Sequence, residues 1–352
     1  MKVWVEALTP KQVLLFSYLQ GELPGEAFLT TRDYDLNVEL AQALWRRFYV
    51  VGAYGGASLE GKLRQSLYRS RRLLEIVKSE EPDAHVTFAS PDSVRVAFGL
   101  RIPIVAATDS PHSDAVSRLT LPLSRAVVVP KFLESSFSAY AKLTEIVKFE
   151  GLFELARILR GEPREKHVVE LGLEPYRYAL VRFGEQKSYY YPSAERALSD
   201  PLNITRWILQ KTDLKVLAYP RYPDQKEAVR RTLERWSQRV IVLERPVDFL
   251  SLEFYAALVV TGGGTLATEA SLIGTPALST YPGRLEVFEY LKSLRFPLYQ
   301  LPQPAWRLGS LLSRGAEPRD WRAVRRRLQQ LFEDPVKVIV SAVLSAAGSK
   351  SF

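Results

Sequence analysis

The chain has 352 residues, of which 47% are hydrophobic and 25% charged, and its formal net charge is +9. This length exceeds one typical core and suits two domains. The absence of cysteine excludes disulfides and thiolate chemistry, and three scattered histidines argue against a structural zinc site, so we expect no metal. The positive charge favours anionic partners; we expect nucleotide phosphates or a membrane surface rather than nucleic acid, because no nucleic-acid recognition motif is visible.

No stretch approaches the roughly 18 apolar residues that span a bilayer, and residues 1–5 begin a strand rather than a signal peptide. The sequence therefore predicts a cytoplasmic protein. Basic residues along the expected helix 58–80 form either a solvated face or a contact with lipid headgroups, which would place the protein at the inner face of the membrane. Two asparagines and one methionine beside 22 prolines indicate a thermophilic source.

Short apolar strands alternate with helices through the first 130 residues. Strands are predicted at residues 2–6, 26–30, 48–51, 84–88, 102–107 and 126–130. Helices are predicted at residues 9–19, 35–47, 58–80 and 91–98. This alternation indicates a parallel sheet whose ligand-binding loops lie at the carboxyl ends of the strands.

The end of the first strand and the start of the helix after it carry polar groups that could line a ligand site. Glu6, Lys11 and Gln12 are expected at the edge of a cleft, with Lys11 and Gln12 on the acceptor side. Such groups can orient a polar substrate by hydrogen bonds and charge.

Residues 108–114, after the fifth strand, form the densest cluster of side chains that could take part in catalysis. His112 could act as a general base, with Asp109 or Asp114 as an alternative base or orienting partner, and Ser110 is expected on the acceptor side. In the other interpretation Asp109 and Ser110 merely cap the next helix and His112 forms local hydrogen bonds.

Residues 145–167 show no alternation and are predicted as the crossover between domains, after which the strand and helix pattern restarts. The fold class is α/β, with two facing doubly wound, Rossmann-like sheets and a ligand cleft between them. The expected domains are 1–150, an acceptor and catalytic domain; 151–170, the crossover; 171–333, a nucleotide-sugar-binding domain; and 334–352, a helix packed on the body.

A glycine-rich turn within residues 257–279 organises the second half. A β-branched apolar run precedes Gly262, Gly263 and Gly264, and a helix follows that contains Thr265 and Glu269. Glycines let backbone N–H groups approach a phosphate at a helix N-terminus, and a carboxylate one turn deeper can bind two ribose hydroxyls. The alternative is a capped, tightly packed strand-to-helix junction without a ligand.

Arg182 and Arg221 follow the first two strands of the second half. A guanidinium matches phosphate oxygens bidentately, so both are candidates for diphosphate contact; each could instead be an ordinary surface arginine.

Five motifs together resemble those of a prokaryotic, largely archaeal family known as domain of unknown function 354, and the resemblance covers nearly the whole chain. They are Leu8-Thr-Pro-Lys-Gln12, Thr31-Arg-Asp-Tyr34, Gly52-Ala-Tyr-Gly-Gly56, Asp109-Ser-Pro-His112 with residues 116–123, and the glycine segment from Gly262 to Pro276.

More distantly, the second half resembles the GT-B superfamily of glycosyltransferases and the non-hydrolysing UDP-N-acetylglucosamine 2-epimerases. The resemblance implies that the glycines and Thr265 hold a diphosphate, that Glu269 holds the ribose, and that Asp109, His112 and Glu6 fall where relatives place catalytic groups.

It follows that the expected function is transfer of a sugar from a nucleotide-diphosphate donor, a UDP-sugar, to an unknown acceptor in the interdomain cleft, without a cofactor. Sugar-nucleotide 2-epimerisation and a non-enzymatic nucleotide-sugar sensor or assembly subunit are the alternatives.

Overall fold

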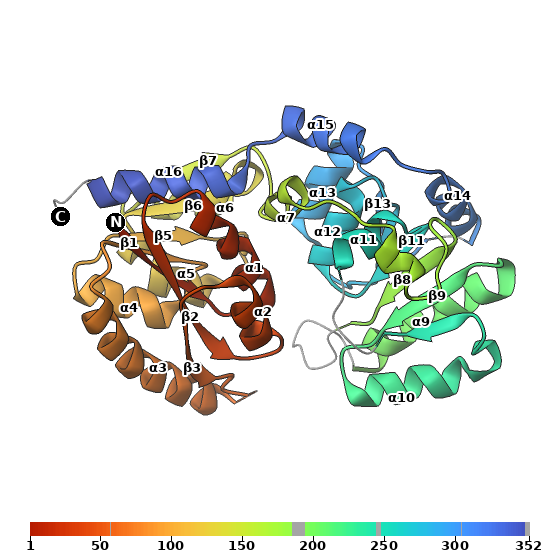
Figure 1. Ribbon diagram of the computed structural model, residues 1–352, viewed down its shortest axis with the longest axis horizontal. Helices are drawn as coiled ribbons and strands as arrows, with labels where there is room; N and C mark the ends of the chain where they lie inside the picture. Colours follow the sequence, from red (N-terminus) through yellow and green to blue (C-terminus); the bar gives the residue numbers. More distant parts are fainter. Residues whose placement is uncertain (57, 185–193, 244–247, 304, 349–352) are drawn as a thin grey trace. The chain divides into compact units, whose positions relative to one another are not determined.

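The computed structural model describes residues 1–56, 58–184, 194–243, 248–303 and 305–348. The chain divides into two compact units (Figure 1). Unit 1 combines Met1–Arg157 with Leu331–Phe352, and unit 2 is Ile158–Gln330. Each unit contains one parallel sheet with helices around it.

The sheet of unit 1 has seven strands in the order β3-β2-β1-β4-β5-β6-β7. Neighbouring strands pair in parallel throughout. Both faces are covered, so the central strands are continuous apolar runs, as parallel sheets require. The strands are β1 Lys2–Ala7, β2 Glu26–Asp33, β3 Phe48–Ala53, β4 Ala84–Thr87, β5 Ile104–Ala107, β6 Ala126–Pro130 and β7 Glu145–Phe149.

Alternate residues of these strands enter two separate cores. Trp4 packs with Leu73 and Val77 of α3, whereas Val3 and Val5 pack with residues of α1 and α16. Alternation places Glu6 on the same sheet face as Trp4, beneath α3. The helices of unit 1 are α1 Pro10–Ser17, α2 Asn37–Leu44, α3 Leu59–Glu80, α4 Pro91–Gly99, α5 Asp114–Thr120, α6 Glu134–Phe137 and α16 Pro335–Gly348, with short 3₁₀ turns at Tyr18–Gly21, Leu121–Leu123, Lys131–Leu133 and Ser138–Tyr140.

Unit 2 has six parallel strands in the order β10-β9-β8-β11-β12-β13. Read from the first strand outward, this is the strand order of a dinucleotide-binding sheet: strands are added on one side of β8 up to β10 and on its other side from β11 onward. The strands are β8 Tyr178–Arg182, β9 Lys215–Tyr219, β10 Val240–Val242, β11 Leu258–Thr261, β12 Ala277–Ser279 and β13 Leu298–Gln300.

The remaining helices belong mainly to unit 2, and α7 contains the boundary between the units. They are α7 Leu155–Arg160, α8 Lys166–Val169, α9 Ala194–Lys211, α10 Pro223–Thr232, α11 Phe249–Phe254, α12 Gly264–Leu272, α13 Glu286–Ser293, α14 Ala305–Gly315 and α15 Trp321–Leu331, with a 3₁₀ turn at Glu234–Trp236. None of the helices in the described ranges is both long enough and apolar enough to cross a membrane.

The prediction of α/β architecture with two Rossmann-like sheets is confirmed. The region 145–167, which shows no alternation in the sequence, begins with a strand, β7 at Glu145–Phe149. This strand pairs with β6 alone and lies at the sheet edge, so it exposes Glu145 and Lys148 and does not show the apolar run of a central strand.

His85 of β4 is a buried imidazole whose neutral form the core requires. Its Nδ1 lies 3.1 Å from the Trp4 carbonyl oxygen and its Nε2 lies 2.9 Å from Ser93 Oγ, and the ring stacks on the Trp4 indole. Burial lowers the pKa of His85 to about 3, although the hydrogen bond to the Trp4 backbone raises it. The unfolded chain, with an ordinary histidine pKa, therefore binds a proton at mildly acidic pH that the folded chain does not bind.

We expect the contribution of His85 to stability to be complete above pH 6.5 and to be lost as the pH falls toward 3. The free energy of unfolding should fall by up to about 1.4 kcal/mol per pH unit in this window. Urea unfolding at several pH values, with unit 1 followed through hydrogen exchange of the β1 and β4 amides, measures this slope. A His85→Gln variant should lose this part of the slope, and an unchanged slope in the variant would contradict the assignment.

Candidate functional site

The glycine turn follows β11 at the point where the strand order of unit 2 reverses. β11 pairs with β8, and Thr261 is the register partner of Arg182. The Gly262 N–H donates to the Arg182 carbonyl at 3.1 Å. The structure thus places Arg182 and the three glycines together at the carboxyl ends of adjacent strands, where open parallel sheets bind ligands.

Gly263 is the N-cap of α12, and nothing in the part of the chain that the structure describes requires a glycine there. Its backbone is extended, with φ −124° and ψ 170°, which other residues adopt equally well. A Cβ added at this position would meet only Thr261 Oγ1, at 3.9 Å. Without a side chain, Gly263 makes no side-chain cap to the N-terminus of α12, whereas a Cβ added at the next residue, Gly264, would lie 3.1 Å from Leu285 Cδ1.

Thr265 and Glu269 lie on α12, one helical turn apart. Thr265 is exposed in the first turn, whereas Glu269 is buried. The helix therefore presents backbone N–H groups and a hydroxyl at its N-terminus, with a shielded carboxylate deeper along it.

Arg221 lies on the loop after β9, the strand next to β8. Its N–H donates to Gln225 Oε1 at 2.8 Å, and Gln225 Nε2 donates to the Gly184 carbonyl at 2.8 Å. The buried Gln225 therefore ties together the loops that carry the two arginines. The Arg182 guanidinium also lies 3.9 Å from the centroid of the Tyr219 ring, which fixes the plane of its side chain.

In unit 1, Lys11 joins two carboxylates at the carboxyl edge of the sheet. Its Nζ lies 2.7 Å from Asp109 Oδ2 and 2.9 Å from Glu154 Oε1. Burial alone raises the pKa of the Asp109 carboxyl, but the charge and hydrogen bond of Lys11 outweigh it, so that this pKa lies below its usual range. Burial lowers the pKa of Lys11, and the two carboxylates more than reverse that effect. Lys11 and Asp109 are therefore both ionised at neutral pH.

The other acceptor-side residues lie close to this cluster in the sequence. Ser110 Oγ donates to Asp109 Oδ1 at 3.0 Å, and Gln12 Oε1 accepts from the Leu8 N–H at 2.7 Å. His112 is exposed and forms no hydrogen bond with the part of the chain that the structure describes.

Glu154 was missed by sequence reasoning because it follows β7, the strand that the apolar pattern did not reveal. A carboxylate just beyond a recognised strand would have been a candidate by the same rule that selected Asp109.

Glu6 lies in a different environment from the cleft edge expected for it, because it is fully buried within the sheet. Its Oε1 accepts from Arg69 Nη2 and its Oε2 accepts from Thr30 Oγ1. Burial raises the pKa of Glu6, and the Arg69 charge opposes this rise. Because side chains alternate along a strand, Glu6 points inward beneath α3, whereas the sequence-based expectation placed it at the edge of a cleft.

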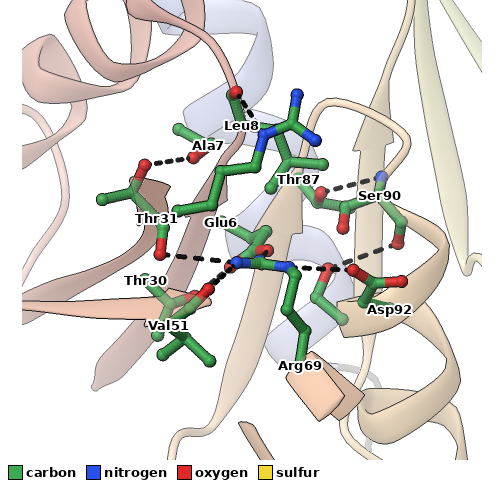
Figure 2. A network of polar contacts seen from close by, with 12 residues as sticks. Glu6, Ala7, Leu8, Thr30, Thr31, Val51, Arg69, Thr87, Ser90 and Asp92 are labelled. Carbon is green, nitrogen blue, oxygen red and sulfur yellow. Dashed lines mark hydrogen bonds and ion pairs between the residues drawn. The ribbon is translucent and has the colours of Figure 1, made fainter. Parts of the chain in front are cut away.

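Arg69 of α3 connects several elements of unit 1 (Figure 2). Besides Glu6, it donates through Nε to Asp92 Oδ2 at 2.9 Å and through Nη1 to the Val51 carbonyl. It is itself buried. One guanidinium thus links β1, β3, α3 and the start of α4 just below the carboxyl edge of the sheet.

Arg32, Tyr34 and Tyr54 form a cluster at the same edge, after β2 and β3. Arg32 Nε donates to the Leu8 carbonyl at 3.1 Å, and its Cζ lies 4.9 Å and 5.4 Å from the centroids of Tyr34 and Tyr54. Burial, followed by the Arg69 charge, lowers the pKa of Arg32. These residues belong to two family motifs, although no role was assigned to them from the sequence.

The described side chains contain no cluster of three or more His, Asp or Glu groups arranged to hold a metal ion.

The paired parallel sheets define a protein of GT-B-like fold, and comparisons with solved structures agree. The Methanocaldococcus jannaschii UDP-GlcNAc 2-epimerase in complex with UDP-GlcNAc and UDP matches with a TM-score of 0.67 and 14% identity, over 98% of this chain and 99% of that one. The glycotransferase of kitacinnamycin matches with a TM-score of 0.56 and 15% identity, over 99% and 97%. At these identities the likeness establishes the fold.

Residues 1–293 match the model of the family described as protein of unknown function (DUF354), and the chain belongs to this family. A relative is the uncharacterised protein MJ0665 of Methanocaldococcus jannaschii, which is 26% identical over 293 residues, 81% of this chain and 83% of that protein.

We expect Arg69→Met to destabilise unit 1 by about 3–5 kcal/mol, because it leaves the buried Glu6 and Asp92 carboxylates without their cation. Loss of Arg69 also raises the pKa of Glu6 further, so the destabilisation should be larger at pH 8 than at pH 5. Urea unfolding at both pH values measures the effect.

The matched control is Arg64→Met on the same helix, since Arg64 pairs with Glu60 in solvent. This change should cost less than about 0.5 kcal/mol. Equal effects of the two substitutions would contradict a structural role for the Arg69 network.

Proposed function

We propose that the protein binds a nucleotide-diphosphate sugar at the N-terminal end of α12 and transfers the sugar to an acceptor. The observation that carries the proposal is Gly263. Among the described residues, neither its backbone conformation nor its packing calls for glycine, and it stands at the N-terminus of α12 without a side-chain cap. A diphosphate fits such a position because the N–H groups and the helix dipole favour negative charge.

The neighbouring residues suit the rest of the donor. Arg182, the last residue of β8, and Arg221, just after the adjacent β9, would neutralise the diphosphate as charge accumulates on the leaving group. Glu269, one turn into α12, would accept hydrogen bonds from the ribose hydroxyls. The UDP-bound structure of the same fold supports a UDP-sugar as the donor, and the proposed reaction needs no cofactor.

The acceptor is proposed to bind at the Lys11, Asp109 and Glu154 cluster of unit 1. An Asp109 carboxylate kept ionised by Lys11 can accept a hydrogen bond from an acceptor hydroxyl and take its proton as the hydroxyl oxygen bonds to the anomeric carbon. The bond between that carbon and the diphosphate breaks in the same step, and the nucleoside diphosphate leaves. His112 remains the alternative base.

Epimerisation at C2 of the sugar is the second candidate, because a UDP-GlcNAc 2-epimerase shares the fold over nearly the whole chain. Incubation with UDP-GlcNAc separates the candidates. Release of UDP with formation of a glycoside supports transfer, an isomerised sugar supports epimerisation, and stabilisation without turnover leaves a binding protein.

We expect Gly263→Val to weaken UDP binding about tenfold or more while the stability of the free chain changes by less than about 1 kcal/mol, because valine is a poorer N-cap but leaves the unfolded chain less freedom. The extended backbone accepts valine and the unfolded chain loses freedom, but the side chain fills the diphosphate space. Thermal shift with and without UDP measures both effects.

Gly309→Ala, in α14, is the control, because an added Cβ there meets nothing within 4 Å and UDP binding should be unchanged. Glu269→Gln should weaken UDP but leave inorganic pyrophosphate binding intact. Undiminished UDP stabilisation in Gly263→Val would overturn the proposed site.

We expect Asp109→Asn to reduce turnover by about 10²–10⁴-fold, the usual contribution of a positioned base. UDP should still stabilise this variant, because Asp109 belongs to unit 1 and the proposed nucleotide site to unit 2. Glu134→Gln, an exposed carboxylate paired with Lys148, is the control and should retain full activity. Full activity in Asp109→Asn would contradict the role of Asp109 as the base and would indicate that another group takes the proton.

A further inference from the structure

The long helix α3 carries a row of leucines that its core contacts leave uncovered. Its buried residues are Arg69, Leu73, Val77 and Glu80. The uncovered leucines, with their exposed fractions, are Leu59 (85%), Leu63 (60%), Leu67 (64%) and Leu74 (40%). At about 100° per residue these four fall within an arc of about 80°, so they form one apolar stripe along the helix.

Basic side chains border this stripe. Arg64, Arg71 and Lys78 recur every seven residues and are exposed, so they lie in a row on the solvent side of the leucines. We call the leucine stripe and this basic row the α3 surface. Helix α3 lies on the outside of unit 1 (Figure 1).

The charges around the α3 surface are unbalanced. The exposed acids of α3, α4 and α5 are Glu60, Glu75 and Asp114, and each forms an ion pair with an arginine of its own helix. One further exposed acid, Glu81, directly follows α3. Among the described residues, the exposed cations Lys62, Arg71, Lys78 and Arg95 form no ion pair. The surface therefore carries uncompensated positive charge beside an apolar stripe.

Exposed apolar side chains are concentrated in this part of the molecule. Within the described ranges, Val169 is the single large hydrophobic residue of unit 2 that is exposed. Helices α3, α4 and α5 alone expose Leu59, Leu63, Leu67, Tyr68, Leu74, Phe98, Val116 and Leu119. Such a concentration marks an interaction surface rather than scattered exposure.

We propose that the α3 surface docks on an anionic lipid bilayer. A helix that lies flat in the interface buries leucines at the boundary between headgroups and acyl chains, while arginine and lysine extend to the lipid phosphates. Nucleic acid would match the cations but not the leucines. A second copy docked through the same surface would bring like charges together. An anionic membrane matches both features.

This inference goes beyond the proposed function and does not depend on it. If both hold, the acceptor class that fits best is a lipid-linked one, because the docked unit also carries the proposed acceptor cluster.

The test is co-sedimentation of the full chain with large unilamellar vesicles, without nucleotide. One vesicle type is phosphatidylcholine alone, and the other is an equal mixture with phosphatidylglycerol. We expect binding to the anionic vesicles that weakens at high salt, and much weaker binding to phosphatidylcholine.

Leu63→Glu/Leu67→Glu should abolish binding. Its control, Leu143→Glu/Val169→Glu, adds the same charge at side chains that are 63% and 54% exposed, and should bind as the wild type does. Arg71→Gln/Lys78→Gln should weaken binding about 25-fold, at about fivefold per charge. Its control, Lys142→Gln/Lys337→Gln, removes exposed cations elsewhere in unit 1 and should have no effect.

Three results would overturn the proposal: no binding to anionic vesicles, equal binding of the α3 and control variants, or a wild-type dimer that Leu63→Glu/Leu67→Glu dissociates. Circular dichroism melts verify that each variant is folded. If the Leu63→Glu/Leu67→Glu variant is unfolded, the Arg71→Gln/Lys78→Gln variant alone tests the proposal. The vesicle assay measures no turnover, so a lack of vesicle binding would not contradict the proposed nucleotide site. Equally, a lack of UDP binding would not contradict membrane docking of the α3 surface.

Discussion

Parallel pairing of every strand is the constraint on which the rest of the structure depends. Because neighbouring strands run in the same direction, all their carboxyl ends meet at one edge of each sheet. In unit 2 this brings the glycine turn beside Arg182, and in unit 1 it brings Lys11, Asp109 and Glu154 together from distant parts of the chain. Chemical groups that are far apart in sequence thus become neighbours without any long loop.

The edge of unit 1 must be held firmly if ionised groups are to keep their positions there. Arg69 does this from below, since one buried guanidinium bonds to carboxylates and carbonyls from several elements. A buried ion pair adds little net stability compared with apolar packing, but it is directional. Its contribution is to fix the register between α3, α4 and the sheet.

The fold and the local part of the site could be predicted from the sequence, because both follow from short-range patterns. Alternating apolar runs and helix signals reveal the two sheets, and the stretch from Gly262 to Glu269 is a single strand-to-helix junction. Contacts between residues that only the tertiary fold brings together were harder to predict from the sequence. Glu154 follows an edge strand with a polar sequence, and Glu6 was expected at the edge of a cleft although strand alternation turns it inward toward Arg69. No pattern along the sequence predicts which cation will pair with a buried carboxylate.

Helix α16 has a consequence for the order in which the molecule assembles. It packs Val336, Ile339 and Val343 into the core of unit 1, although the whole of unit 2 precedes it in the chain. During synthesis from the N-terminus, unit 2 can therefore complete its core before α16 has been made and has covered one face of the sheet of unit 1. Val86, Val105 and Val128, on the strands that α16 covers, lack this helix until then. Chaperone dependence and sensitivity to C-terminal truncation should accordingly belong to the unit that is made first.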